Sequence, residues 1–166
     1  MEGLYAEARA KKKVTAKDNL IKFLLVGGMI VSFALGFLAD MVFIILGLVF
    51  LGVGYYFLPR LATEYEYVFC DGQVDFDRIS GGVKRKTLLR VDFEKLVVIA
   101  PKNSHALDGY RHNGVQVKDF SSMEEHARVY AMVIKGNEQN ILIYFEPSDK
   151  MLAAMKQKAP RKIMDY

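Results

Sequence analysis

Three histidines, His105, His112 and His126, lie in or beside one irregular stretch of the sequence, with Asp108 between the first two. Imidazole and carboxylate groups are common zinc ligands, but a zinc site needs three or four of them converging at about 2 Å. The spacing of His105 and His112 matches no standard zinc motif. We therefore predict exposed loop histidines and no metal site.

Possible nucleophiles are present, but none has an evident activating partner. Cys70, the single cysteine, precedes a tight turn without a basic group or helix end beside it. Ser121 and Ser122 precede Glu124 and Glu125, but no histidine can be assigned to either serine as a general base. The sequence also contains neither a Walker loop nor the glycine motif of dinucleotide-binding folds. We predict a protein that is not an enzyme and needs no cofactor.

Basic side chains form two groups in a chain of net charge +4. Neither group has the continuous basic stripe expected of a nucleic-acid-binding protein, so nucleic acid is excluded as a predicted partner. The first group lies at the start of the long apolar block described next and is called juxtamembrane for that reason. It consists of Lys11, Lys12, Lys13, Lys17 and Lys22. The second group, a possible contact for lipid headgroups or a protein partner, consists of Lys84, Arg85, Lys86 and Arg90.

An apolar block at residues 20–58 contains only two charges, Lys22 and Asp40. As one helix it would measure about 58 Å, nearly twice the thickness of the hydrocarbon core. Two membrane-spanning helices fit, at about residues 20–39 and 41–58, with Asp40 in the turn between them. A carboxylate at the centre of a span costs about 2.5–3.5 kcal/mol, whereas at the tip it is solvated. We favour the turn, with a functional intramembrane carboxylate as the alternative.

The flanks of the block predict its orientation. Basic residues precede the first span, Arg60 follows the second, and the tip carries none, so both termini are predicted to be cytoplasmic at the cell membrane. Thr15 and Asp18 have the spacing of a capping box, which places the start of the first helix there. A signal peptide ending near residues 34–36 is the alternative, although the block is long for one and a second span follows directly.

Small residues recur on both predicted helices. On the first helix they are spaced four apart, which allows close helix packing. The set comprises Gly28, Ser32, Gly36, Gly47 and Gly54. We favour packing within the hairpin, with a homo-oligomer interface as the alternative.

The remainder, residues 63–162, reads as a β domain behind a basic N-terminal segment at residues 1–19. Asp71-Gly72 predicts a tight hairpin with Tyr67 and Phe69 on the core face. Further strands are expected at residues 83–91, 95–100, 115–120, 130–135 and 138–145, and a helix runs from Ser148 to Pro160. In the last hairpin, a Gly136-Asn137 turn would pair Met132 with Ile141 and Tyr130 with Ile143.

The predicted strand register places acidic residues beside part of the second basic group. Glu66, Asp75 and Asp77 fall on the solvent face of the first hairpin, and Lys84 and Lys86 fall beside the aspartates. Arg85 is expected to point to the other face. Because acids would pair with much of this group, we predict only weak binding of the isolated domain to anionic vesicles.

Seven short strands followed by one amphipathic helix resemble the pleckstrin-homology-like (PH-like) fold. Together with the preceding apolar hairpin, stretches such as "EYEYVFCDGQVDFDRI" and "GVKRKTLLRVDFEKLVVIAP" are similar to an uncharacterised family of bacterial membrane proteins with a C-terminal PH-like domain. The resemblance implies an α+β fold: a two-helix transmembrane hairpin, then a sandwich or barrel of about seven antiparallel strands capped by a helix. It implies no catalytic residues.

Two functions remain compatible with the sequence. The favoured one is a membrane-anchored, non-catalytic interaction module that presents the PH-like domain to a protein or lipid partner. The alternative is a small accessory or scaffold subunit of a membrane-embedded assembly such as a transporter or pore. The predicted partners are the bilayer, a protein of unknown identity and, as an open possibility, a second copy of the chain.

Overall fold

The computed structural model describes residues 4–111 and 115–164, so His112 lies outside the described residues. The chain forms two compact units. One consists of residues 13–63 together with residues 80–83. The other consists of residues 1–12, 64–79 and 84–166.

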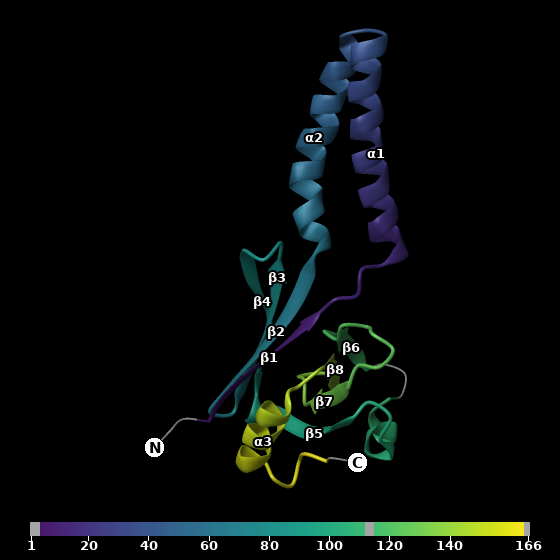
Figure 1. Cartoon of the computed structure of the whole chain (residues 1–166). Helices are drawn as coiled ribbons and strands as arrows, with labels where there is room; N and C mark the ends of the chain where they lie inside the picture. The colour runs from purple at the N-terminus through teal and green to yellow at the C-terminus, as the bar shows by residue number, and fades with distance from the viewer. Residues whose placement is uncertain (1–3, 112–114, 165–166) are drawn as a thin grey trace. The chain divides into compact units, whose positions relative to one another are not determined.

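Two antiparallel helices, α1 (Ala16–Leu38) and α2 (Val42–Leu61), make up most of the first unit (Figure 1). The carboxylate of Asp18 accepts a hydrogen bond from the N–H of Thr15 at 2.9 Å, which caps the start of α1. Asp40 lies in the turn between the helices, where its carboxylate accepts a hydrogen bond from the N–H of Val42 at 3.1 Å. Each helix extends beyond the predicted 20–39 and 41–58, by about one turn, at its end away from Asp40.

Small residues bring the two helices close together. Ser32 is buried, and a Cβ added at Gly28 would lie 2.9 Å from the Phe50 ring. A Cβ at Gly47 would lie 3.1 Å from the Phe33 ring, and one at Gly36 would collide with Ile44. Gly54 differs, because a Cβ there would meet only Leu58 of its own helix. Four of the five predicted packing residues therefore lie at the contact between the helices.

Replacing Gly36 with leucine should separate α1 from α2. The backbone nitrogen of Ile44 lies only 3.0 Å from the position of the added Cβ, so a rotamer change cannot relieve the overlap. We expect Gly36→Leu to lower the melting temperature in detergent by several degrees, whereas Val31→Leu, at an exposed site on the same helix, should change it little. Equal shifts for the two variants would contradict packing through the small residues.

The first sheet of the second unit has the strand order β1-β2-β3-β4. Its strands are β1 (Tyr5–Lys11), β2 (Thr63–Cys70), β3 (Gln73–Ser80) and β4 (Lys84–Asp92). Strand β1 pairs with β2 in antiparallel register, with Tyr5 opposite Cys70 and Lys11 opposite Glu64. The hairpin α1–α2 is thus inserted in the chain between two paired strands.

Strand β1 corrects the sequence prediction, which placed residues 5–11 in a basic segment outside the β domain. The stretch "YAEARAK" contains three alanines and several charges, a composition that favours a helix and carries no strand signal. Pairing with β2 overrides this preference, and Ala6 and Ala10 are buried in the core.

The second sheet has the strand order β5-β7-β8-β6. Its strands are β5 (Leu96–Pro101), β6 (Gln116–Asp119), β7 (Tyr130–Ile134) and β8 (Ile141–Phe145), and β6 runs parallel to β8. Two short 3-10 helices, η1 (Phe93–Lys95) and η2 (His105–Tyr110), precede and follow β5. Helix α3 (Asp149–Lys158) comes last, and the hydroxyl of its N-cap residue Ser148 accepts the N–H of Met151.

The register of the last hairpin differs from the prediction by two residues. Met132 pairs with Ile143 rather than Ile141, and Tyr130 pairs with Phe145. A two-residue shift leaves every side chain on its predicted face, so the alternation of apolar residues could not detect it. The connection runs over residues 135–140 instead of a two-residue turn at Gly136-Asn137.

One apolar core is shared by both sheets and α3. Its largest members are aromatic, and Met151 and Met155 of α3 pack against them. Buried Tyr67 donates a hydrogen bond from its hydroxyl to the carbonyl of Phe120 at 2.5 Å, and burial raises the pKa of this phenol. The other face of the second sheet packs under Leu107 of η2. The predicted fold class is confirmed, with one strand more than expected among the described residues.

Candidate interaction site

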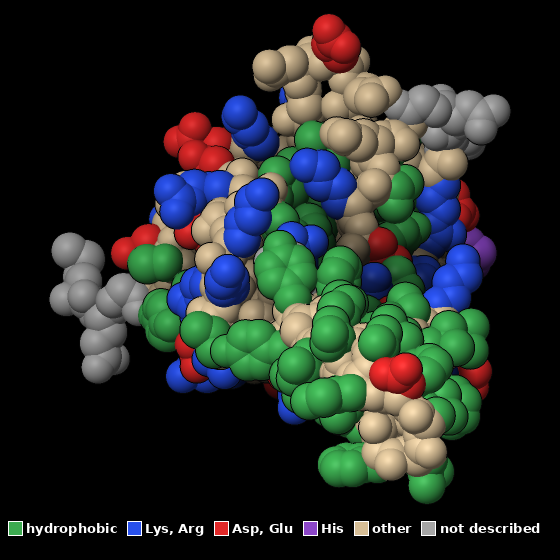
Figure 2. Space-filling model, turned by 90° about the horizontal axis from the view of Figure 1, so that it is seen from above, with side chains coloured by type: hydrophobic (Ala, Val, Ile, Leu, Met, Phe, Trp, Pro, Cys, Tyr) green, Lys and Arg blue, Asp and Glu red, His purple; other side chains and the backbone are tan. Residues whose placement is uncertain are grey.

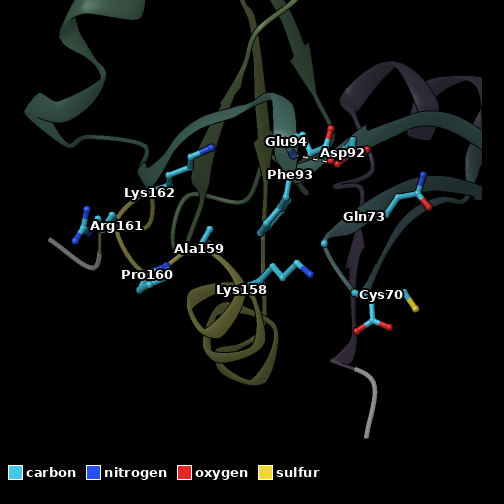
Figure 3. Close-up of a pocket in the computed structure, with 12 residues that line it drawn as sticks. Cys70, Gln73, Asp92, Phe93, Glu94, Lys158, Ala159, Pro160, Arg161 and Lys162 are labelled. Carbon is cyan, nitrogen blue, oxygen red and sulfur yellow. Dashed lines mark hydrogen bonds between the residues drawn. The ribbon is translucent and has the colours of Figure 1, made fainter. Parts of the chain in front are cut away.

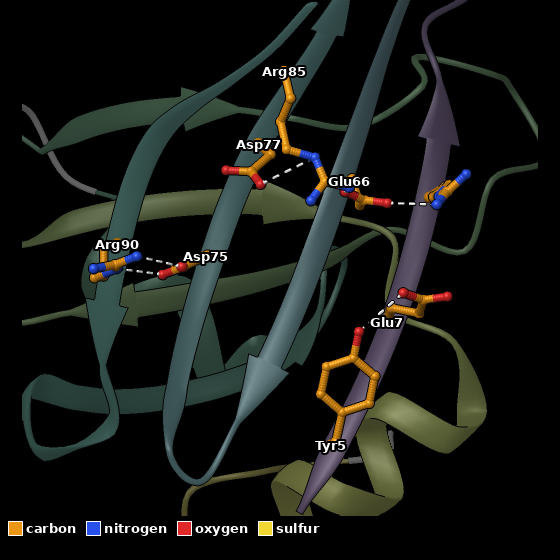
Figure 4. Close-up of polar contacts among 8 residues, drawn as sticks. Tyr5, Glu7, Glu66, Asp75, Asp77, Arg85 and Arg90 are labelled. Carbon is orange, nitrogen blue, oxygen red and sulfur yellow. Dashed lines mark hydrogen bonds and ion pairs between the residues drawn. The ribbon is translucent and has the colours of Figure 1, made fainter. Parts of the chain in front are cut away.

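The outer face of the first sheet carries a cluster of opposite charges, here called the ion-pair cluster: Arg9, Glu66, Asp77 and Arg85. The Arg9 guanidinium lies 2.7 Å from the carboxylate of Glu66, which is fully buried. Arg85 pairs with Glu66 from the other side and lies 3.7 Å from Asp77 (Figure 4). A carboxylate removed from water needs such partners, so the two arginines compensate the burial of Glu66.

The position of Arg85 contradicts the predicted register. The sequence placed Lys86 opposite Asp77 and turned Arg85 to the other face, whereas Arg85 contacts the acids. Strict alternation would keep Arg85 and Arg90 on different faces, yet both pair with acids. The adjacent residues Leu88 and Leu89 both pack against the core, which shows that β4 departs from regular alternation between the two arginines.

Two further pairs complete this face. Arg90 donates two hydrogen bonds of 2.7 Å to Asp75, and these bonds raise the pKa of the Arg90 guanidinium. Lys11 lies 3.5 Å from Glu64. Acids on the inner strands β2 and β3 thus pair with basic residues on the edge strands β1 and β4. These ion pairs compensate the charges of Arg9, Lys11, Arg85 and Arg90.

A sequence model of the bacterial PH-like domain family DUF6106 matches residues 2–165. The chain belongs to this family. The match includes the helical hairpin as well as both sheets and α3, so the PH-like domain and the two apolar helices occur together in the family pattern. No curated protein and no solved structure matches the chain.

The PH-like domain divides the predicted basic contact residues into two pairs. Arg85 and Arg90 are engaged by acids, as described above. Lys84 and Lys86 are exposed, and within residues 4–111 and 115–164 neither forms an ion pair. The predicted neutralisation therefore falls on the arginines, and the two lysines at the start of β4 remain available.

The juxtamembrane lysines lie on three different segments. Lys11 belongs to β1, Lys12 and Lys13 lie in the connection to α1, and Lys17 and Lys22 are in the first two turns of α1. Lys11 and Lys12 thus belong to the unit of the two sheets, and the other three belong to the unit of the helical hairpin.

Within the described residues, the histidines and serines considered for catalysis are either exposed or hydrogen-bonded to nearby acids. His105 is exposed and lies 3.1 Å from Asp108, and His126 is also exposed. Ser121 donates from its hydroxyl to Asp119 at 2.6 Å. Ser122 is buried and donates its N–H to Glu146 at 2.5 Å. In the described part of the chain no three histidine, cysteine or acidic side chains come together as metal ligands.

The PH-like domain has a cleft of about 790 Å³. The sequence analysis did not predict it. Three distant segments line it: the β2–β3 turn, the β4–η1 corner and the end of α3 (Figure 3). At its edge Gly72 has φ +99°, and a Cβ there would lie 2.9 Å from the Lys158 side chain. The charged residues lining the cleft comprise three acids and three bases: Asp71, Asp92, Glu94, Lys158, Arg161 and Lys162. This balance favours neither an anion nor a cation as its ligand.

Proposed function

We propose that the protein is a membrane-anchored, non-catalytic interaction module. In this proposal α1 and α2 cross the cell membrane, both termini are cytoplasmic, and the PH-like domain is held at the membrane surface for a protein or lipid partner. The proposal rests on the helical hairpin, whose apolar surface is left uncovered, together with a domain family that generally serves in interactions rather than catalysis.

The apolar surface of the hairpin is the observation that carries this proposal. The two apolar stretches have a mean hydropathy of 2.2 each, and only 6% and 11% of their residues are buried. Hydrophobic side chains gather over the helices in Figure 2. A core helix of a soluble protein would be mostly covered, whereas exposing this much apolar surface to water costs about 25 cal/mol per Å². Lipid supplies the missing apolar surroundings.

The pairing of β1 with β2 supports two crossings. Lys11 precedes the hairpin, Glu64 follows it, and the two residues are direct partners in one sheet. A single crossing would leave the two strands on opposite sides of a membrane, where they cannot pair. A signal peptide cleaved near residues 34–36 would also remove β1 from the sheet, so the pairing argues against that alternative.

The topology can be tested by cysteine labelling in intact cells. With Cys70 replaced by serine, single cysteines are introduced as Asp40→Cys, Lys13→Cys and Lys150→Cys, all at exposed positions. A membrane-impermeant maleimide should label position 40 directly. It should label positions 13 and 150 only after permeabilisation, which also serves as the control for reactivity. Labelling at position 150 in intact cells would contradict the proposed orientation.

A further inference from the structure

The β3–β4 turn, residues 81–83, belongs with the last residue of β3 to the same compact unit as the helical hairpin. The N–H of Gly81 donates a hydrogen bond to the carbonyl of Ala62 at 3.0 Å, directly after α2. Gly81 has φ +63°, and a Cβ there would lie 3.0 Å from Pro59. Glycine is required both by this backbone conformation and by the close approach. The turn is thereby held against the C-terminal end of α2.

This end of α2 carries aromatic side chains of the kind found at membrane surfaces. Tyr55, Tyr56 and Phe57 precede Pro59, and all three have large exposed fractions. Tyrosine is enriched where a spanning helix leaves the hydrocarbon, because its ring is apolar and its hydroxyl is polar. If α2 spans the membrane, its C-terminal end lies at headgroup depth, and the β3–β4 turn held against it lies there too.

The composition of the turn fits that depth. Val83 is 87% exposed, so its apolar side chain is open to whatever surrounds the turn. It is followed in the chain by the exposed Lys84, with Lys86 two residues further, and neither lysine is engaged by an acid in the described parts of the chain. An exposed apolar side chain next to free ammonium groups is the combination that binds the interface of an anionic membrane.

We propose that the β3–β4 turn is a membrane-contact loop, in which Val83 enters the interfacial layer and Lys84 and Lys86 bind the phosphates of anionic lipids. The inference rests on the proposed function, since it needs α2 to span the bilayer. Two lysines are too few to recruit a free domain to a membrane. The helical hairpin, however, tethers the turn to the bilayer, so the lysines meet the lipid phosphates at a high effective concentration.

The chain contains no tryptophan, so a single introduced tryptophan reports its own surroundings. The full-length Val83→Trp variant is reconstituted into phosphatidylcholine vesicles with and without phosphatidylglycerol, and lipids brominated near the headgroup serve as quenchers. We expect blue-shifted emission and strong quenching. The control is Tyr5→Trp, an exposed aromatic position at the other end of the same sheet, opposite Cys70. Emission and quenching of Val83→Trp equal to those of Tyr5→Trp would overturn the inference.

A third reporter separates this inference from the proposed function. Ile45→Trp lies on the exposed surface of α2 and should be quenched by lipids brominated deep in the acyl chain. If Ile45→Trp is not quenched, the membrane-spanning hairpin itself is wrong. If Ile45→Trp is quenched and Val83→Trp is not, only the membrane-contact loop is wrong.

The role of the lysines is tested in the Val83→Trp background. Lys84→Gln/Lys86→Gln should reduce quenching in phosphatidylglycerol vesicles about twofold, to the level seen in phosphatidylcholine alone. Lys150→Gln/Arg161→Gln removes the same charge from two exposed sites elsewhere in the domain and should leave quenching unchanged. Quenching that depends neither on phosphatidylglycerol nor on Lys84 and Lys86 would overturn the assignment of anionic headgroups as the ligand.

Discussion

A fragment that starts after the helical hairpin, at residue 63, should fail to form a stable domain. It lacks β1, which pairs with β2 along seven residues and contributes Ala6 and Ala10 to the core. It also lacks Arg9, a partner of the fully buried Glu66. Losing a half-exposed partner of a buried carboxylate costs about 2–3 kcal/mol, and the lost strand pairing adds to this, against a total stability of about 5–15 kcal/mol for a typical domain.

The matched control restores β1 without the helices. Because Lys11 lies directly opposite Glu64, a short Gly/Ser linker of about four residues can join residue 12 to residue 63, as in an ordinary β-hairpin. We expect this joined domain to be soluble and to unfold cooperatively in urea, while the fragment from residue 63 aggregates or shows no cooperative transition. Equal stability of the two proteins would contradict the role of β1.

Replacing Arg85 with alanine should destabilise the domain by roughly 2–3 kcal/mol. Arg85 is half exposed, but its partners Glu66 and Asp77 are buried, so the variant leaves two carboxylates with Arg9 as the remaining cation of the ion-pair cluster. The measurement is urea unfolding of the joined domain. Lys86→Ala, at the exposed neighbouring position, should change the free energy of unfolding by less than about 0.5 kcal/mol.

A second variant separates charge from packing at this position. Asp77→Asn removes one of the buried charges that Arg85 compensates, so Arg85→Ala/Asp77→Asn should be more stable than Arg85→Ala alone. A double variant no more stable than Arg85→Ala, or equal effects of Arg85→Ala and Lys86→Ala, would show that the ion-pair cluster contributes little to the fold.

The helical hairpin and most strands could be predicted because their signals are local. An apolar run of fixed length, a capping box at Thr15 and a tight turn at Asp71-Gly72 each specify structure within a few residues. The strand β1 could not be found in this way. Its alanines and charges favour a helix when read alone, and its partner residues lie 53–65 positions further along the chain.

The candidate site was predicted only in part, for a related reason. The prediction that acids pair with part of the basic group was based on regular alternation, which β4 does not keep between Arg85 and Arg90. The contact of Gly81 with Ala62 and Pro59 joins a turn to a helix end that is distant in the sequence. No spacing rule brings such segments together, so the proposal of a membrane-contact loop needed the structure in addition to the basic residues noted in the sequence.

The insertion of α1 and α2 between β1 and β2 has a consequence for biosynthesis. Strand β1 leaves the ribosome before either helix, whereas β2 follows both, so the edge of the first sheet stays unpaired until the whole hairpin has been translated. With the proposed topology, β1 finds its partner only when α2 has returned the chain to the cytoplasmic side. Completion of the sheet therefore depends on correct membrane insertion, and a misinserted chain would keep an open β edge that proteases and chaperones recognise.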